Sequence, residues 1–226
     1  MKTYPMFALL TDKPCLVVGG GAVGERKVLD LLEAGARVTV VSRTLTPALA
    51  KLAAQGEIVY LAGDFAPEQV ETMALVMGAT DDEQVNARVS TAARSRGIWV
   101  NIADAPELCT FIVPAQVRRG ELTLAISTGG ASPALARKLR EELEGRFGPE
   151  YGPYLTLLKK VREHLLSARR GHGENPQLFL RLVSGPLKEA LAHKDRDRAV
   201  GLLQDTLGHV LAPDALTALV DEVLGG

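Results

Sequence analysis

The residues best suited to chemistry near the start of the chain are the glycines of Gly19–Gly24, which follow the pattern G-x-G-x-x-G. A short apolar run, Cys15–Val18, precedes them, and a pattern typical of a helix follows. In this context Gly19 would permit a tight turn, Gly21 would let the backbone approach a pyrophosphate, and Gly24 would let the helix pack closely on the strand. The helix N-terminus would also offer unpaired N–H groups to the phosphates. We therefore predict a dinucleotide site, the alternative being a glycine-rich turn that binds nothing.

The residues that would bind the adenosine half of the dinucleotide follow the second and fourth predicted strands. An acidic residue is usual near position 42, but this chain has Ser42, Arg43 and Thr44 there. Arg43 could stack on adenine or bind a 2′-phosphate, so this position leaves the choice between NAD and NADP open. Thr80 and Asp81 are candidates for ribose contacts, and either could also be the N-cap of the next helix, since the two roles do not exclude each other.

A carboxylate follows the fifth predicted strand, in the segment Asn101–Pro106. At the carboxyl edge of the sheet, Asp104 would lie close to a nicotinamide ring and could accept a proton as hydride leaves a substrate. The alternative for Asp104 is an Asx-turn before Pro106. Asn101 would either position a ligand or cap the end of the strand.

A second polar cluster, Ser127–Pro133, leads into another predicted helix. Its sequence, STGGASP, could form an anion-binding loop, or it could be a glycine-rich connector that Ser132 caps. The basic residues around it are Arg118, Arg119, Arg137, Lys138 and Arg140. They could bind substrate carboxylates, or they could form an ordinary solvated surface.

Strand and helix patterns alternate through residues 1–110, which predicts an α/β fold. The runs expected to form strands are Cys15–Val18, Arg37–Val41, Glu57–Leu61, Met73–Gly78 and Ile98–Ile102. The helical patterns between them are Ala22–Glu33, Thr46–Gln55 and Asp81–Arg96. Apolar strands that alternate with helices favour a Rossmann-like doubly wound parallel sheet covered on both faces.

The pattern changes after residue 110. Two strand patterns, Phe111–Val117 and Glu121–Ser127, flank a turn, and a long helical pattern begins at Ser132-Pro133. From residue 147 onward the chain reads as helical. We therefore predict three parts: a Rossmann domain at 1–110, a small α+β region at 111–146 and a C-terminal helical domain at 147–226.

The composition excludes several classes of protein. The 226 residues carry 26 Lys and Arg against 27 Asp and Glu, so the net charge of -1 argues against a nucleic-acid-binding protein. The apolar runs are too short to span a bilayer, and the N-terminus does not resemble a signal peptide. The two cysteines and four histidines show no metal-ligand spacing. We expect a cytoplasmic protein without a metal site, a nucleic-acid partner or a membrane partner.

Five segments, taken in order, resemble the precorrin-2 dehydrogenase domain of siroheme synthase. They are Gly19–Lys27, Ala79–Asp82 with Val85 and Asn86, Asn101–Pro106, Phe111–Pro114 and Ser127–Arg140. The resemblance implies oxidation of precorrin-2 to sirohydrochlorin with NAD as the cofactor. For some members it also implies insertion of ferrous iron, as a second substrate, to give siroheme.

The resemblance also implies roles for individual residues. Ala22 and Val23 would contact the NAD pyrophosphate, Arg43 and Thr44 would contact the adenosine half, and Asp104 would be the catalytic carboxylate. The expected cofactor contacts are Gly19, Gly21, Ala22, Val23, Gly24, Ser42, Arg43, Thr44, Thr80 and Asp81. The expected contacts to precorrin-2 are Asn101, Arg118, Ser127, Thr128, Gly129, Gly130 and Arg137.

Thr128 stands where relatives have a serine, so the hydroxyl is kept. The resemblance further implies a homodimer formed through the region near Phe111–Arg146. Three alternatives stay open: a dehydrogenase without chelatase activity, a dinucleotide-sensing module without turnover, and a small-molecule reductase of another pathway.

Overall fold

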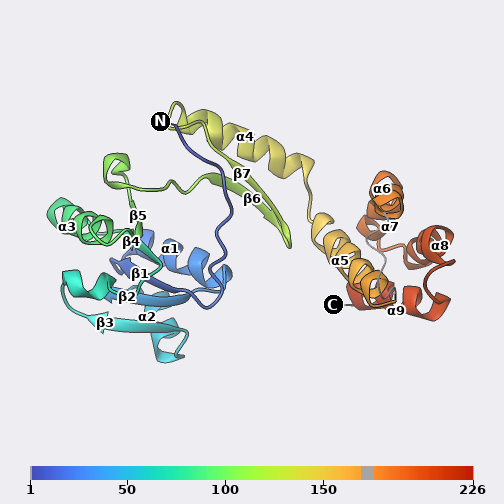
Figure 1. Ribbon diagram of the computed structural model, residues 1–226, viewed down its shortest axis with the longest axis horizontal. Coiled ribbons are helices and arrows are strands. Elements are labelled where there is room, and N and C mark those ends of the chain that lie inside the picture. Colours follow the sequence, from blue (N-terminus) through green and yellow to red (C-terminus); the bar gives the residue numbers. More distant parts are fainter. Residues whose placement is uncertain (1, 169–175, 226) are drawn as a thin grey trace. The chain divides into compact units, whose positions relative to one another are not determined.

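The computed structural model describes residues 2–168 and 176–225, and the chain divides into two compact units. The first unit is Tyr4–Val113, and the second is the chain from Pro114 onward with the first few residues. Figure 1 labels the helices and strands of both units. The expected boundaries at 110 and 146 stay a prediction.

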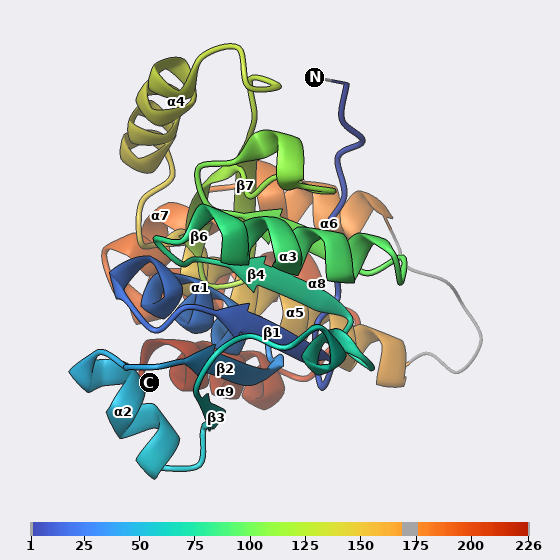
Figure 2. The ribbon, with the colours of Figure 1, turned by 90° about the vertical axis from the view of Figure 1, so that its left-hand side faces the viewer.

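A five-stranded parallel sheet forms the centre of the first unit. Its strands are β1 (Pro14–Val18), β2 (Arg37–Ser42), β3 (Ile58–Ala62), β4 (Leu75–Gly78) and β5 (Trp99–Ile102). They are arranged in the order β3-β2-β1-β4-β5, and all neighbours are parallel. Strands β3, β2, β1 and β4 follow one another from bottom to top in Figure 2. The predicted Rossmann-like sheet is confirmed.

Helices cover both faces of this sheet because successive side chains of its strands point to opposite sides. They are α1 (Ala22–Glu33), α2 (Pro47–Ala54), η1 (Pro67–Val70), α3 (Glu83–Arg94) and η2 (Pro106–Leu108). Cys15 and Val17 of β1 belong to the apolar core that α1 and α2 complete. Leu16 and Val18 belong to the opposite core, which η1 and α3 complete. The alternation of strands and helices therefore produces two apolar cores, one on each face of the sheet.

The second unit begins with a hairpin followed by a long helix. Strands β6 (Ala115–Arg119) and β7 (Leu122–Ile126) pair in antiparallel fashion, and α4 (Pro133–Arg146) follows. Gly120 makes the turn of the hairpin at a φ of 58°, in the left-handed region that favours glycine. The hairpin and the helix were both expected from the sequence, but the first strand begins at Ala115 and not at Phe111, and it extends to Arg119.

Five further helices form the C-terminal core of the second unit. They are α5 (Tyr151–Ala168), α6 (Pro176–Ser184), α7 (Leu187–Ala192), α8 (Arg196–Leu207) and α9 (Pro213–Leu224). Apolar side chains from all of them, mostly leucines, form one buried cluster. The expected helical character of this part of the chain is confirmed.

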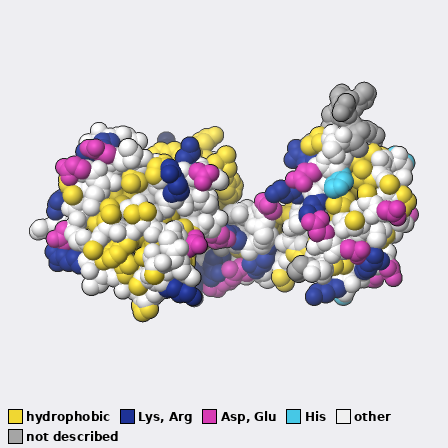
Figure 3. All heavy atoms as spheres, turned by 90° about the horizontal axis from the view of Figure 1, so that it is seen from below, with side chains coloured by type: hydrophobic (Ala, Val, Ile, Leu, Met, Phe, Trp, Pro, Cys, Tyr) yellow, Lys and Arg dark blue, Asp and Glu magenta, His cyan; other side chains and the backbone are white. Residues whose placement is uncertain are grey.

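The surface of the described chain mixes both signs of charge. On the face shown in Figure 3, Lys and Arg side chains alternate with Asp and Glu. Among residues 2–168 and 176–225, no helix is both long and apolar enough to cross a membrane.

The C-terminal core yields a stability prediction. Leu157 of α5 is fully buried, so Leu157→Ala would leave a cavity and lower the free energy of unfolding of this unit by about 2–5 kcal/mol. On the same helix Leu166 is 51% exposed, and Leu166→Ala would change stability by less than about 0.5 kcal/mol. Urea denaturation followed by circular dichroism measures both. Equal effects of the two variants would contradict the packing described here.

Candidate active site

The glycine loop between β1 and α1 is shaped by two close backbone contacts. At Gly19, where φ is 120°, an added Cβ would lie 2.2 Å from the carbonyl oxygen of Ala79. At Gly24 it would lie 2.1 Å from the carbonyl oxygen of Gly19. Gly21 is the open position, with nothing within 4 Å of an added Cβ. These contacts match the needs of a dinucleotide loop, two glycines for packing and one for ligand approach.

The N-terminus of α1 can receive a phosphate. Gly21 is its N-cap, and no side chain caps the first N–H groups. These groups and the helix dipole favour an anion at this end. The loop also lies where β1 has β2 on one side and β4 on the other, which is the switch point at which such sheets bind ligands. The residues present therefore fit a bound dinucleotide.

Ser42 has a supporting role in this loop. Its Oγ accepts a hydrogen bond from the backbone N–H of Gly20 at 3.0 Å, and the N–H of Thr46 donates to the carbonyl of Gly20 at 3.0 Å. Ser42 and Thr46, at the two ends of the segment after β2, are thus both hydrogen-bonded to Gly20 of the glycine loop. Arg43 and Thr44 are exposed on this segment, and their contacts with adenosine stay a prediction.

A cavity of about 540 Å³ opens beside the glycine loop. It brings together four residues predicted as site residues, which are Val23, Thr80, Asp81 and Asp104. Side chains that the sequence analysis had not assigned to the site also line it, among them Glu83, Asn86 and Glu107. The structure therefore joins the predicted cofactor loop and the predicted carboxylate in one space.

Asn86 organises the segment after β4. Its Nδ2 donates to the carbonyl of Thr80 at 2.9 Å, and its Oδ1 accepts from Thr80 Oγ1 at 2.9 Å. Asn86 is buried, and both ends of its amide are satisfied. In the sequence, Asn86 stands out only within the segments that carry the resemblance, and no pattern there indicates this role.

The alternative in which Thr80 or Asp81 caps the following helix is wrong. Neither Thr80 nor Asp81 caps α3, because the helix begins at Glu83 and Asp82 is the N-cap. Asp82 Oδ1 accepts from the backbone N–H groups of Gln84 at 2.8 Å and Val85 at 3.1 Å. The Thr80 hydroxyl bonds Asn86 instead, and Asp81 is exposed at the cavity. Both residues thereby stay available as predicted ribose contacts.

Asp104 lies in the turn between β5 and η2 and has a φ of 58°. Aspartate tolerates this left-handed conformation better than most residues do. The preceding residue, Ala103, continues the sheet through a 2.9 Å bond from its N–H to the carbonyl of Gly78. The exposed Asp104 side chain is therefore carried at the carboxyl edge of β5, where the sequence predicted it.

Cys109 joins the residues on either side of Asp104 through its sulfur atom. The backbone N–H of Ile102 donates to Cys109 Sγ at 3.2 Å, and Sγ lies 3.3 Å from the carbonyl oxygen of Ala105. Directly after it, Thr110 Oγ1 accepts from the N–H of Val100 at 2.8 Å. The chain thus returns along β5, and both ends of the turn are fastened to that strand.

Asn101 contributes to the same closure. It is buried in β5, and its Nδ2 donates to the carbonyl of Phe111 at 3.1 Å. This is a structural use of the side chain, and its contact with a substrate stays a prediction.

Lys27 of α1 is a charged neighbour that sequence analysis did not weigh. Burial, followed by the charge of Arg26, lowers the pKa of the Lys27 ammonium, while negative charges that include Asp104 act in the opposite direction. An ammonium group therefore lies within electrostatic range of the Asp104 carboxylate.

The hydroxyl groups of the Ser127–Pro133 loop are engaged within the second unit. Thr128 Oγ1 accepts from the N–H of Ser132 and donates to its carbonyl, each at 3.1 Å. Ser127 Oγ accepts from the N–H of Gly129, and Ser132 caps α4 by accepting from the N–H of Leu135. The connector capped by Ser132 is confirmed, and anion binding stays a prediction.

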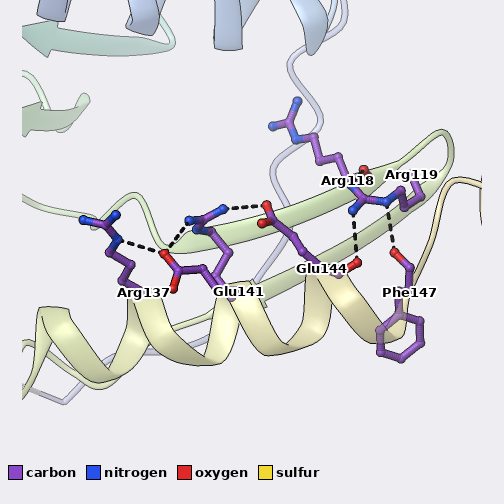
Figure 4. A network of polar contacts seen from close by, with 7 residues as sticks. Arg118, Arg119, Arg137, Glu141, Glu144 and Phe147 are labelled. Atoms are coloured by element: carbon purple, nitrogen blue, oxygen red, sulfur yellow. Dashed lines mark hydrogen bonds and ion pairs between the residues drawn. The ribbon is translucent and has the colours of Figure 1, made fainter.

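Arginines of the second unit bind glutamate side chains along α4 and backbone carbonyls near its end, as Figure 4 shows. Arg137 Nε donates to Glu141 Oε1 at 2.9 Å on the exposed face of α4. Arg119 donates to the backbone carbonyls of Phe147 and Glu144, and Arg118 donates to the side chain of Gln116. Arg119 therefore joins the hairpin to the end of α4. The expected substrate contacts of Arg118 and Arg137 stay predictions.

Within the described part of the chain, no three His, Cys, Asp or Glu side chains form a group that could hold a metal ion.

Two family models match this chain, and the description of the first agrees with a dinucleotide site. A family model described as "Putative NAD(P)-binding" matches residues 6–115, and one described as "Sirohaem biosynthesis protein central" matches residues 119–146. Among curated relatives, siroheme synthase of Methylobacillus flagellatus is 44% identical over 208 residues, and that of Salmonella paratyphi B is 38% identical over 208 residues. Each alignment covers 92% of this chain, and the chain spans 44% and 45% of the length of these relatives.

A solved structure, "SirC, precorrin-2 dehydrogenase", matches with a TM-score of 0.73 and 27% identity, covering 90% of this chain and 98% of that one. The similarity thus includes both the dinucleotide-binding unit and the segment that follows it. The chain is therefore similar to siroheme synthases over 92% of its own length and to a precorrin-2 dehydrogenase over 90% of it.

Proposed function

We propose that this protein oxidises precorrin-2 to sirohydrochlorin with NAD. The observation that carries the proposal is the single cavity in which Val23 of the glycine loop, the Thr80–Asp81 segment and Asp104 meet. The matching precorrin-2 dehydrogenase structure supports the choice of substrate. Both cysteines are free thiols, which fits the cytoplasmic location included in this proposal.

Different residues of this chain would bind the cofactor and accept the proton. The glycine loop and the N-terminus of α1 would hold the pyrophosphate, and Thr80 and Asp81 would contact ribose. Accepting a hydride is the chemistry that NAD supplies when bound. Oxidation also releases a proton, and the Asp104 carboxylate, fixed at the same edge, would accept it. The predicted contacts of precorrin-2 with Arg118, Arg137 and the Ser127–Gly130 loop belong to this proposal.

Ferrochelation is the further activity that the resemblance implies for some members. It would use the same carboxylate, because pyrrole N–H protons must leave when iron enters the macrocycle. Iron would then be a substrate.

The first test is anaerobic conversion of precorrin-2 with NAD, followed by absorbance, with and without ferrous iron. NAD-dependent formation of sirohydrochlorin would support the dehydrogenase. Iron-dependent formation of siroheme, faster than without enzyme, would support the chelatase. NAD binding without any conversion would contradict both and favour a dinucleotide-sensing module.

Asp104→Asn tests the role of the carboxylate. Asparagine also tolerates a positive φ, so the turn should persist while the proton acceptor is lost. We expect turnover to fall by about 100-fold or more, with NAD affinity unchanged. Anaerobic turnover and calorimetric titration of NAD measure the two quantities. Full turnover, or a loss of NAD affinity instead, would mean that Asp104 only shapes the turn.

Cys109 is expected to act on the reaction by positioning Asp104. Because its Sγ binds both arms of the turn, Cys109→Ala should lower kcat by about threefold to tenfold and leave KM for NAD unchanged. Cys109→Ser, which keeps a donor and an acceptor, should restore part of kcat.

Cys15 provides the control for Cys109. It is fully buried in β1, and burial raises the pKa of its thiol to about 11. Cys15→Ala should lower stability by about 1 kcal/mol without lowering kcat. A serine variant at position 109 no better than alanine, or an equal loss of kcat in Cys15→Ala, would contradict the positioning role.

We propose that the active protein is a homodimer formed through residues 111–146. In this stretch only Val117 is a buried apolar residue, and α4 buries none of its 14 residues. A hairpin and a helix with so little buried surface gain stability when another surface covers them. A second copy of the chain is the cover that the family resemblance implies.

Leu135→Glu tests this surface, because Leu135 is 47% exposed on α4. Light scattering should show a dimer for the unmodified protein and weaker association for the variant. Leu166→Glu, at a similarly exposed position on α5, should leave the dimer intact. A monomeric unmodified protein would contradict the proposal.

A further inference from the structure

An ion pair joins Arg43 and Asp64 at the carboxyl edge of the sheet. Arg43 Nε lies 2.6 Å from Asp64 Oδ1, and Arg43 Nη2 lies 3.1 Å from Oδ2. The guanidinium therefore binds both carboxylate oxygens in the two-pronged geometry that is most specific for this pair. The two residues are 21 positions apart, so the sequence alone does not indicate that Asp64 is the partner of Arg43.

The pair stands next to the loop that would hold the dinucleotide. Arg43 directly follows Ser42, whose Oγ accepts from the N–H of Gly20 in the glycine loop. Any ligand seated on the glycine loop therefore has the Arg43 segment as its neighbour. The position after β2 is also where dinucleotide-binding folds contact the adenosine ribose.

The register of the sheet brings Asp64 to the same place. Ser42 at the end of β2 pairs with Ala62 at the end of β3, and the N–H of Gly63 donates to the carbonyl of Ser42 at 3.1 Å. Asp64 follows Gly63 directly. On its other side Phe65 is buried, and its carbonyl accepts from Arg88 at 3.2 Å. The backbone on both sides of Asp64 is thus anchored.

Two arginines and two aspartates contribute charge at this edge. Arg43 and Arg88 are positive, and Asp64 and Asp82 are negative. The hydrogen bond from Arg43 lowers the pKa of the Asp64 carboxyl, burial opposes this by raising it, and the charges of Arg43 and Arg88 lower it further. Asp82 adds a second negative charge within electrostatic range of Arg43. Asp64 is therefore ionised at neutral pH and neutralises the guanidinium that faces it.

Stability does not explain the pair. Its side chains are 78% and 69% exposed, and ion pairs so exposed contribute little to the free energy of folding. The Arg43–Asp64 pair instead changes the charge that would face the adenosine ribose of a bound dinucleotide. A free arginine after β2 would attract a 2′-phosphate, and an acidic residue there would bind the 2′-hydroxyl of NAD.

We propose that Asp64 makes this protein select NAD over NADP by holding and neutralising Arg43. The acidic residue that is missing after β2 is supplied by the end of β3. NADP would bring a 2′-phosphate toward the Asp64 carboxylate and toward an arginine that is already bound. The inference deepens the proposed function, on which it rests for the presence of a dinucleotide at this loop.

The test is calorimetric titration of NAD and NADP with the full chain and with Asp64→Asn. The unmodified protein should bind NAD more tightly than NADP. In Asp64→Asn, Arg43 is released to a 2′-phosphate, so the ratio of the two dissociation constants should shift by about tenfold toward NADP. Adding Arg43→Ala to Asp64→Asn should abolish that shift, because the arginine is the group released.

A matched pair elsewhere in the chain provides the control. Arg196 Nε and Nη2 lie 2.6 Å and 3.0 Å from the two carboxylate oxygens of Asp221, in the C-terminal helices. Asp221→Asn removes the same kind of contact and should leave the NAD to NADP ratio unchanged.

Two results would overturn the inference. In the first, the ratio of the NAD and NADP dissociation constants of Asp64→Asn stays within about twofold of the ratio in the unmodified protein. The other is a shift that persists in the double variant without Arg43. Both results concern only the ratio of the two affinities, whereas turnover of the unmodified protein tests the proposed dehydrogenase, so the two failures are distinguishable.

Discussion

The close approach of Gly19 to the backbone of Ala79 is the contact on which the first unit depends. It brings the turn after β1 against the turn after β4, and Val23 of the glycine loop and the Thr80–Asp81 segment line the same cavity. Any side chain at Gly19 would have to displace a main-chain carbonyl. The order of the strands then places the end of β5, and with it Asp104, beside the same space.

Signals that lie close together in the sequence were sufficient to predict much of this arrangement. Gly19–Gly24 could be assigned because a strand pattern, the glycine spacing and a helix pattern follow one another directly. Asp104 could be assigned because it follows a strand whose carboxyl end had to lie at the ligand edge. The predicted parallel sheet follows from the same alternation.

The remaining features depend on contacts between distant segments. Asp64 meets Arg43 across 21 positions, and only the register of β2 against β3 brings them together. The satisfied amide of Asn86 and the bonds of Cys109 depend on how a turn folds back, which a pattern of residue types does not specify. Capping of α3 by Thr80 or Asp81 was a wrong alternative because Thr80, Asp81 and Asp82 are all good caps, and only the start of the helix at Glu83 distinguishes them.

The turn that carries Asp104 has a consequence for the free energy of substrate binding. Its two arms are joined by Cys109, and Thr110 and Asn101 fasten the returning chain to β5. The conformational entropy of this segment is therefore lost when the protein folds. A substrate that reaches the carboxylate need not supply that ordering again, so more of its binding energy remains for the transition state. Preorganisation at this site is thus provided by thiol, hydroxyl and amide contacts that need not touch the substrate themselves.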